Sequence, residues 1–175
     1  MQKSTLSALP PGDPEFWIAR LARLHAPAEL VANLTGLSKD AIGRIYLDAT
    51  GHPASFAPIE STPAAWFLAN ARRRFHGAMF LALYGVTAKK FDHCASLANA
   101  YYHYASMTAG GRDAADDSEP AFAVLERDYV ISFARANELV DLVIHRAPAG
   151  AGQPSLNVRK CILCDSAFID DAGGQ

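Results

Sequence analysis

Residues 28–51 read AELVANLTGLSKDAIGRIYLDATG, an apolar pattern interrupted by glycine at Gly36. The spacing predicts a short helix, a turn at Gly36 and a second helix. Val31 lies on the inner face of the first helix, while Ile42 and Ile45 are three residues apart and share a face of the second. This order of helix, turn and helix is typical of a DNA-reading helix-turn-helix.

The second helix of this pair would present one polar face outward, and we expect Leu37, just before it, to point inward. The outward residues are Ser38, Lys39, Asp40, Gly43, Arg44 and Leu47. In a DNA-binding helix-turn-helix this face enters the major groove, so Lys39 and Arg44 are candidate DNA contacts. An ordinary corner between two helices has the same spacing, and that alternative stays open.

The composition indicates one domain with a sizeable core. The chain has 175 residues, of which 50% are hydrophobic and 19% charged, with a net charge of −2. A protein that coats nucleic acid unaided is more basic, so DNA binding would need local basic residues or a partner. The three cysteines do not form a disulfide framework, and we find no secretory signal or membrane span. We therefore expect a cytoplasmic protein without membrane contact.

The remaining apolar pattern predicts further helices separated by proline and glycine. Their expected ranges are 13–25, 63–84, 88–107 and 120–145. Asp13, Ser61 or Thr62, and Thr87 are the expected caps of the first three. Residues 52–60 contain two prolines and are predicted to form an extended linker.

The fold class expected from these elements is all-α. Residues 1–146 would form a multi-helix bundle that contains the helix-turn-helix-like pair at 28–51. Residues 147–175 would form a linker and a small β-like knuckle that carries a CxxC motif.

The CxxC motif, Cys161-Ile-Leu-Cys164, is the sharpest chemical signal in the sequence. Two thiolates at this spacing provide half of a tetrahedral zinc site. Three interpretations stay open: a zinc site completed by His145 or by another chain, a half-site, or a redox pair. Cys94 lies on an apolar helix face and is expected in the core.

Consecutive arginines at Arg72, Arg73 and Arg74 are the best candidates for contacts to DNA phosphates. Successive residues are 100° apart around a helix, so the three side chains point in different directions and at least two should be solvated. Lys89 and Lys90 are weaker candidates of the same kind. The alternative for all five residues is a solvated helix face.

No arrangement of residues supports catalysis. The sequence contains no phosphate-binding glycine loop, and no nucleophile, base and orienting group can be named together. We expect surface or partly buried imidazoles at His76, His93 and His103. Asp113, Asp116 and Asp117 are expected in a solvated loop. We therefore expect a protein that is not an enzyme.

Taken together, these segments resemble the FlhC family of flagellar master transcriptional regulators. The resemblance rests on TGLSKDAIGRIYLDATGHPAS (35–55), STPAAWFLAN (61–70), GAMFLALY (77–84) and CILCDSAF (161–168), and it covers roughly residues 18–170. The STPAAWF segment and its distance from the helix-turn-helix are the more specific parts.

The resemblance implies a mostly helical subunit that pairs with FlhD, in an assembly of four FlhD-type and two FlhC-type chains. Such a complex binds promoter DNA and activates flagellar operons through RNA polymerase, and FlhC-like activators also occur outside flagellar operons. The family binds zinc through four cysteines, of which Cys161 and Cys164 match the first two. The alternatives are a shortened interaction paralogue that does not bind DNA, and a small zinc or redox protein centred on the CxxC motif.

Overall fold

The computed structural model describes residues 13–108, 130–145 and 155–172. Within these ranges the chain is mostly helical, as expected, but the all-α class is not exact, because the segment expected as a β-like knuckle forms an antiparallel two-stranded sheet. The elements are α1 (Pro14–Arg23), α2 (Ala28–Thr35), α3 (Lys39–Thr50), α4 (Ala64–Leu68), α5 (Ala71–Thr87), α6 (His93–Thr108), α7 (Phe133–Val143), β1 (Leu156–Lys160) and β2 (Ala167–Asp171).

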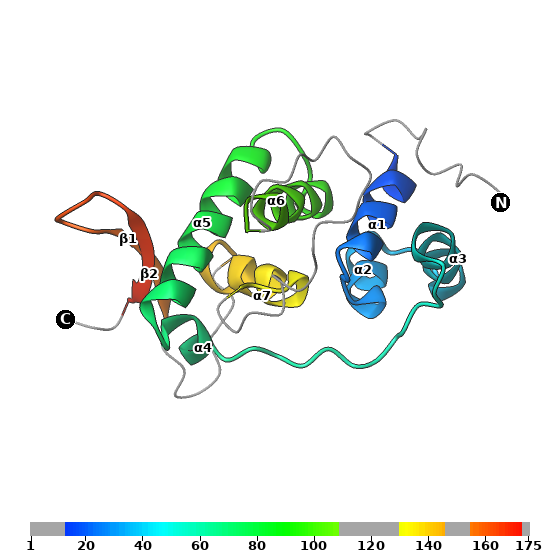
Figure 1. Cartoon of the computed structure of the whole chain (residues 1–175), viewed down its shortest axis with the longest axis horizontal. Helices are drawn as coiled ribbons and strands as arrows, with labels where there is room; N and C mark the ends of the chain where they lie inside the picture. The colour runs from blue at the N-terminus through cyan, green and yellow to red at the C-terminus, as the bar shows by residue number, and fades with distance from the viewer. Residues whose placement is uncertain (1–12, 109–129, 146–154, 173–175) are drawn as a thin grey trace.

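Figure 1 shows three groups of elements along the long axis of the molecule. Helices α1 to α3 gather at one end, α5 to α7 occupy the middle, and the β-hairpin lies at the other end. Residues 52–60 contain no helix or strand and run along the outside between α3 and α4, as expected for the linker. No helix among the described residues is long and apolar enough to cross a membrane.

The predicted order of helix, turn and helix is confirmed at α2 and α3. The Ser38 side chain accepts a hydrogen bond from the Ala41 amide, and Gly36 and Gly51 end the two helices at φ values of 69° and 74°. A positive φ favours glycine, because it has no Cβ to collide with the neighbouring carbonyl. Ile42 is fully buried, but Leu37 is exposed, so the expectation that it points inward is wrong.

The single helix expected over 63–84 is wrong, because the chain forms α4 and then α5. The side chain of Asn70 accepts a hydrogen bond from the Arg73 amide and so caps a new helix. Ser61 and Thr62 do not cap α4 with their side chains. Instead, the Ser61 hydroxyl and the Thr62 amide donate to the Glu138 carboxylate of α7, which fixes the end of the linker on that helix.

Helix α5 passes Gly85 and ends at Thr87, so Thr87 does not cap the next helix as expected. Its buried hydroxyl contacts the carbonyl oxygens of Tyr84 and Ser96, each 3.0 Å away. Helix α6 begins only at His93, after Asp92 accepts a hydrogen bond from the Ala95 amide.

The helix expected over 120–145 is shorter in the part that the structure describes. Residues 120–129 lie outside the described residues, and Val130 and Ile131 are buried but not helical. The Ser132 side chain accepts from the Arg135 amide and starts α7. The aspartate-rich loop at 113–117 also lies outside the described residues.

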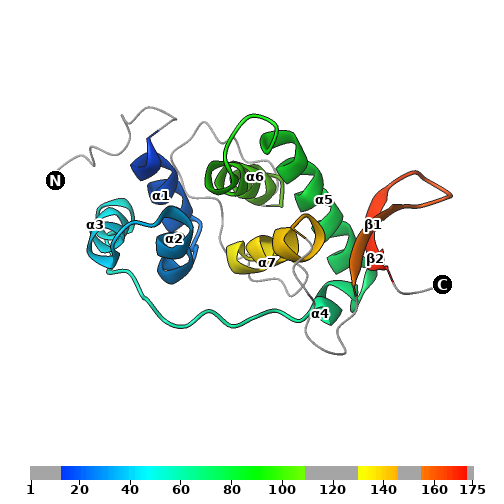
Figure 2. The same cartoon turned by 180° about the vertical axis from the view of Figure 1, so that it is seen from behind.

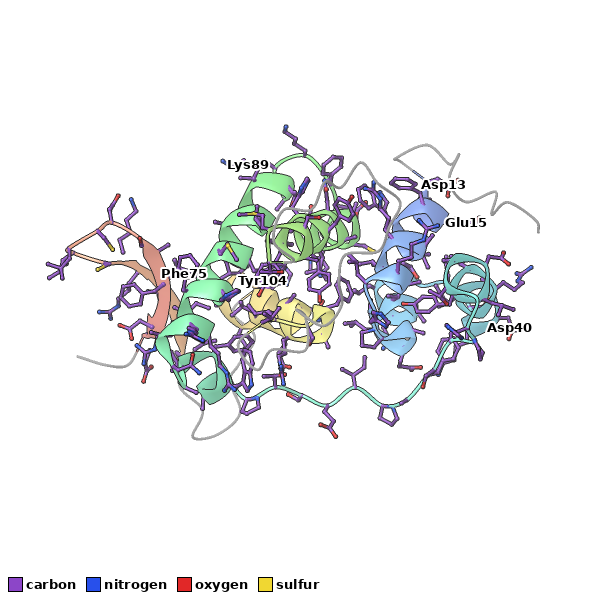
Figure 3. All side chains as sticks on the ribbon, viewed as in Figure 1. Asp13, Glu15, Asp40, Phe75, Lys89 and Tyr104 are labelled. Carbon is purple, nitrogen blue, oxygen red and sulfur yellow. The ribbon has the colours of Figure 1, made fainter. Side chains whose placement is uncertain are left out.

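Tyr104 joins the three central helices. Its ring is fully buried, and Figure 3 shows it between α5 and α7. Its hydroxyl accepts from the Ile131 amide at 2.9 Å and lies 2.8 Å from Nδ1 of His76. Since the hydroxyl can then donate to Nδ1, the neutral imidazole fits this network. Burial lowers the pKa of His76 in agreement with that assignment.

The β-hairpin packs against α5 through Ile169, which is fully buried. A Cβ atom added to Gly77 would overlap the Ile169 side chain, so the missing side chain at Gly77 permits the close approach. Figure 2 shows the hairpin against α5 from the opposite side. The strands pair Leu156 with Asp171 at one end and Lys160 with Ala167 at the other, so the CxxC motif occupies the turn.

Candidate nucleic-acid interface

The outer face of α3 contains the first pair of predicted DNA contacts. Lys39, Arg44 and the neighbouring Leu47 are exposed, as expected for an outward face. Nζ of Lys39 lies 2.6 Å from Oε2 of Glu29 on α2. The charges of Lys39 and Arg44 are balanced by Asp40 and Asp48 on the same helix. This face is therefore close to electrically neutral.

The three predicted arginines of α5 lie in different surroundings, and Arg73 and Arg74 contact other elements of the chain. Arg72 is exposed. The guanidinium carbon of Arg73 lies 4.3 Å from the Trp66 ring centroid. Nη1 of Arg74 lies 3.2 Å from Oδ1 of Asp170, and its Nε donates to the Leu68 carbonyl at 3.1 Å. These contacts leave Arg73 and Arg74 partly buried, and the Arg74 side chain is still 36% exposed.

Two arginines from distant segments lie beside this run. The Arg135 guanidinium of α7 lies 4.2 Å from the Trp66 ring centroid, so Trp66 contacts two guanidinium groups. Nε of Arg159 on β1 lies 3.5 Å from Oδ2 of Asp170, the carboxylate that also contacts Arg74. We call the group of Arg72, Arg73, Arg74, Arg135 and Arg159 the arginine surface.

The arginine surface combines several positive charges at the positive end of a helix. The first turn of α5 contains no acidic residue, although helix N-termini favour carboxylates over cations. Burial lowers the pKa of Arg135, and the neighbouring charge of Arg73 lowers it further. A phosphate group beside these guanidinium groups would be held by charge-assisted hydrogen bonds.

Sequence reasoning missed Arg135 and Arg159. Arg135 lies in the first turn of α7, where a cation opposes the helix dipole, and this is the one local signal that marks it. Lys89 and Lys90 are exposed but lie just beyond the C-terminal end of α5. Figure 3 shows Lys89 at the far end of this helix from the hairpin, so these lysines do not join the arginine surface.

The two cysteines of the CxxC motif lie at the tip of the hairpin. The Cys161 amide donates to the Ser166 carbonyl and the Asp165 amide donates to the Cys161 carbonyl, each at 2.9 Å, which closes the turn. Hydrogen bonds from Ser166 and from the Cys161 thiol lower the pKa of Cys164. Ile162 and Leu163 between them are 98% and 91% exposed.

The cysteine pair fits two of the four ligands of a tetrahedral zinc site. Among the described residues, no group of three His, Cys, Asp or Glu side chains is placed to hold a metal ion, so Cys161 and Cys164 have no third or fourth ligand there. His145, a suggested third ligand, instead lies against His93 and Asp141. Cys94 is partly buried and lies at the start of α6 rather than in its middle, and burial raises its pKa.

Comparison of the chain with known protein families and with curated proteins gives no match.

Proposed function

We propose that this protein is an FlhC-like DNA-binding subunit of a transcriptional activator. It acts with an FlhD-like partner at promoter DNA and contacts RNA polymerase there, at flagellar or related operons. The observation that carries the proposal is the arginine surface, which gathers basic side chains from α5, α7 and β1 beside the hairpin.

The two candidate surfaces would have different tasks. Arginines that contact phosphates position a protein on the duplex without reading its sequence. The arginine surface suits that task, since its side chains come from three elements that share one core. The neutral outer face of α3 contributes little to general attraction, so the α2–α3 pair supports docking or reads bases only once the duplex is in place.

A hetero-oligomer accounts for the net charge of −2, because a partner subunit would supply further positive charge. The broad apolar faces of the central helices are mostly buried in the core of this chain. Several large apolar side chains nevertheless stay exposed and offer contacts to a partner: Phe75, Val86, Phe91, Met107 and Ile144. Figure 3 shows Phe75 on the side of α5 nearer the hairpin.

Zinc, if bound by Cys161 and Cys164 with ligands from elsewhere, would supply structural cross-linking of the hairpin tip. The chain itself contributes the turn that keeps both thiols together and the hydrogen bonds that favour the Cys164 thiolate. The arginine surface forms without this metal.

Co-expression with an FlhD-like protein tests the proposal. We expect a stable complex that retards duplex promoter DNA, with an affinity that falls steeply as salt rises. Arg73→Ala and Arg135→Ala should each weaken binding, and Lys90→Ala is the matched control at the other end of α5. Unchanged affinity in both arginine variants would contradict the assigned surface.

One observation favours a second candidate, an interaction subunit without DNA binding. Glu29 neutralises Lys39 on the face where a recognition helix would need free positive charge. In that case the complex with the partner forms and purifies, but promoter DNA is not retarded at low salt.

A further inference from the structure

A cluster of titratable side chains lies away from the arginine surface, where α5, α6 and the end of α7 meet. The rings of His93 and His145 have their centroids 5.0 Å apart. The Tyr84 hydroxyl lies 2.9 Å from Nδ1 of His93, and Oδ1 of Asp141 lies 2.9 Å from Nδ1 of His145. Each imidazole is thus held by a neighbour through the same ring nitrogen.

The second nitrogen of each ring is available. Within the described part of the chain, Nε2 of His93 and Nε2 of His145 make no hydrogen bond. Histidines that bind a metal through one ring nitrogen usually have the other held by a carboxylate, hydroxyl or carbonyl group. The contacts to Tyr84 and Asp141 give both rings this arrangement.

Asp141 is itself held in position by a second hydrogen bond. Its Oδ2 accepts a hydrogen bond from the Asn137 side chain at 3.2 Å, so both carboxylate oxygens are engaged. Tyr84 and Asp141 therefore anchor one imidazole each. Since both Nδ1 atoms face these neighbouring anchors, both Nε2 atoms face away from them.

The site can be reached from solvent and attracts cations. The side chains of His145 and Asp141 are 44% and 42% exposed. Two imidazole nitrogens beside one carboxylate suit a borderline transition-metal ion such as Zn²⁺, Ni²⁺ or Cu²⁺. Magnesium and calcium prefer oxygen ligands, so this donor set does not suit them.

We propose that His93 and His145 bind one divalent transition-metal ion through their Nε2 atoms, with Tyr84 and Asp141 as positioning residues. Water completes the coordination. The ion joins the first residue of α6 to the residue that follows α7 by two positions, so it stabilises the packing of these helices. The proposal is independent of DNA binding and of the CxxC motif.

Isothermal titration of the full chain with ZnCl₂ and NiCl₂ tests the proposal, in a Cys161→Ser, Cys164→Ser background that removes the competing thiols. We expect one equivalent of metal bound at neutral pH and a higher melting temperature with metal present. His93→Gln and His145→Gln should each weaken binding by about tenfold or more, and Asp141→Asn by about tenfold. His103→Gln is the matched control, because His103 is exposed on the same helix.

Two further measurements separate metal binding from folding. Each variant is melted first in metal-free buffer, and EPR of the background protein with one equivalent of Cu²⁺ should show hyperfine coupling to two imidazole nitrogens. Unaltered affinity in His93→Gln or His145→Gln, or no binding in the background protein at about 1 mM metal, overturns the proposal.

Discussion

The outer face of α3 and the arginine surface differ in whether their charged residues favour the helix that carries them. Helix α3 follows those rules, with Ser38 as its N-cap, Asp40 in its first turn and Gly51 at its end. Helix α5 also has a capping residue, but it places three arginines where the helix dipole repels them. Charges that oppose local stability are expected at functional sites, so the comparison favours the α5 end of the molecule.

The two regions also differ in how they are assembled. The charges on the α3 face are contributed by one continuous segment and its neighbour α2, and the positive charges of Lys39 and Arg44 are outnumbered by three carboxylates, at Asp40, Asp48 and Glu29. The arginine surface requires α5, α7 and β1 to pack together, with Trp66 and Asp170 holding its side chains in place. The function proposed for the arginine surface therefore depends on tertiary packing, while the α3 face depends on local structure.

Among the substitutions that test this comparison, Ile169→Ala should have the largest effect on stability. Removing a fully buried side chain from the contact between β2 and α5 should lower the free energy of unfolding by about 2–5 kcal/mol. Urea denaturation measures this change, and DNA retardation should weaken as Arg159 loses its position. Leu163→Ala at the exposed hairpin tip is the control and should change stability by no more than about 0.5 kcal/mol. Equal stability of the two variants would show that the hairpin does not pack on α5 as described.

Alanine substitution of one glycine in each region should have opposite effects. A Cβ at Gly77 overlaps Ile169, whereas a Cβ at Gly43 of α3 meets no atom within 4 Å. Gly77→Ala should destabilise the protein by roughly 1 kcal/mol net, since overpacking exceeds the gain in helix propensity. Gly43→Ala should stabilise it by about 1 kcal/mol. The midpoints of urea unfolding give the signs, and shifts in the same direction would contradict the packing described for Gly77.

The smallest expected effect is the pH dependence of stability that one histidine of the central helices contributes. Because burial lowers the pKa of His76 below its unfolded value of 6.5, its neutral form stabilises the fold at higher pH. That contribution is present above about pH 6.5 and is lost as pH falls through the lower folded-state pKa. Melting temperatures measured over this range should fall less steeply for His76→Gln than for the unsubstituted chain. A parallel decline in both proteins would assign the pH dependence to other groups.

Local sequence patterns were sufficient for the helix-turn-helix. Ser38, Gly36 and Gly51 set its boundaries through their own backbone preferences, and Ile42 is buried as its spacing predicts. The break before α5 was not predictable from the apolar pattern, which continues across it. The break depends on the Asn70 side chain, which competes with the helical backbone as a cap.

The candidate site was only partly predictable for a related reason. The arginine run at 72–74 is visible in the sequence, but Arg135 and Arg159 reach it through long-range packing. The charge of the α3 face also depends on Glu29, which only the fold brings to Lys39. The FlhC-like assignment and zinc binding stay predictions.

The salt dependence of DNA affinity tests the central claim most directly. Binding of a mixed-sequence duplex to the co-expressed complex is measured by fluorescence anisotropy over a range of KCl concentrations, for Arg72→Ala/Arg135→Ala and for Lys39→Ala/Arg44→Ala. If the arginine surface binds phosphates, the first variant should reduce the slope of log affinity against log salt by about 1 for each phosphate that is no longer neutralised, and the second should leave it unchanged. A reduced slope in the α3 variant, with an unchanged slope in the arginine variant, would contradict the claim.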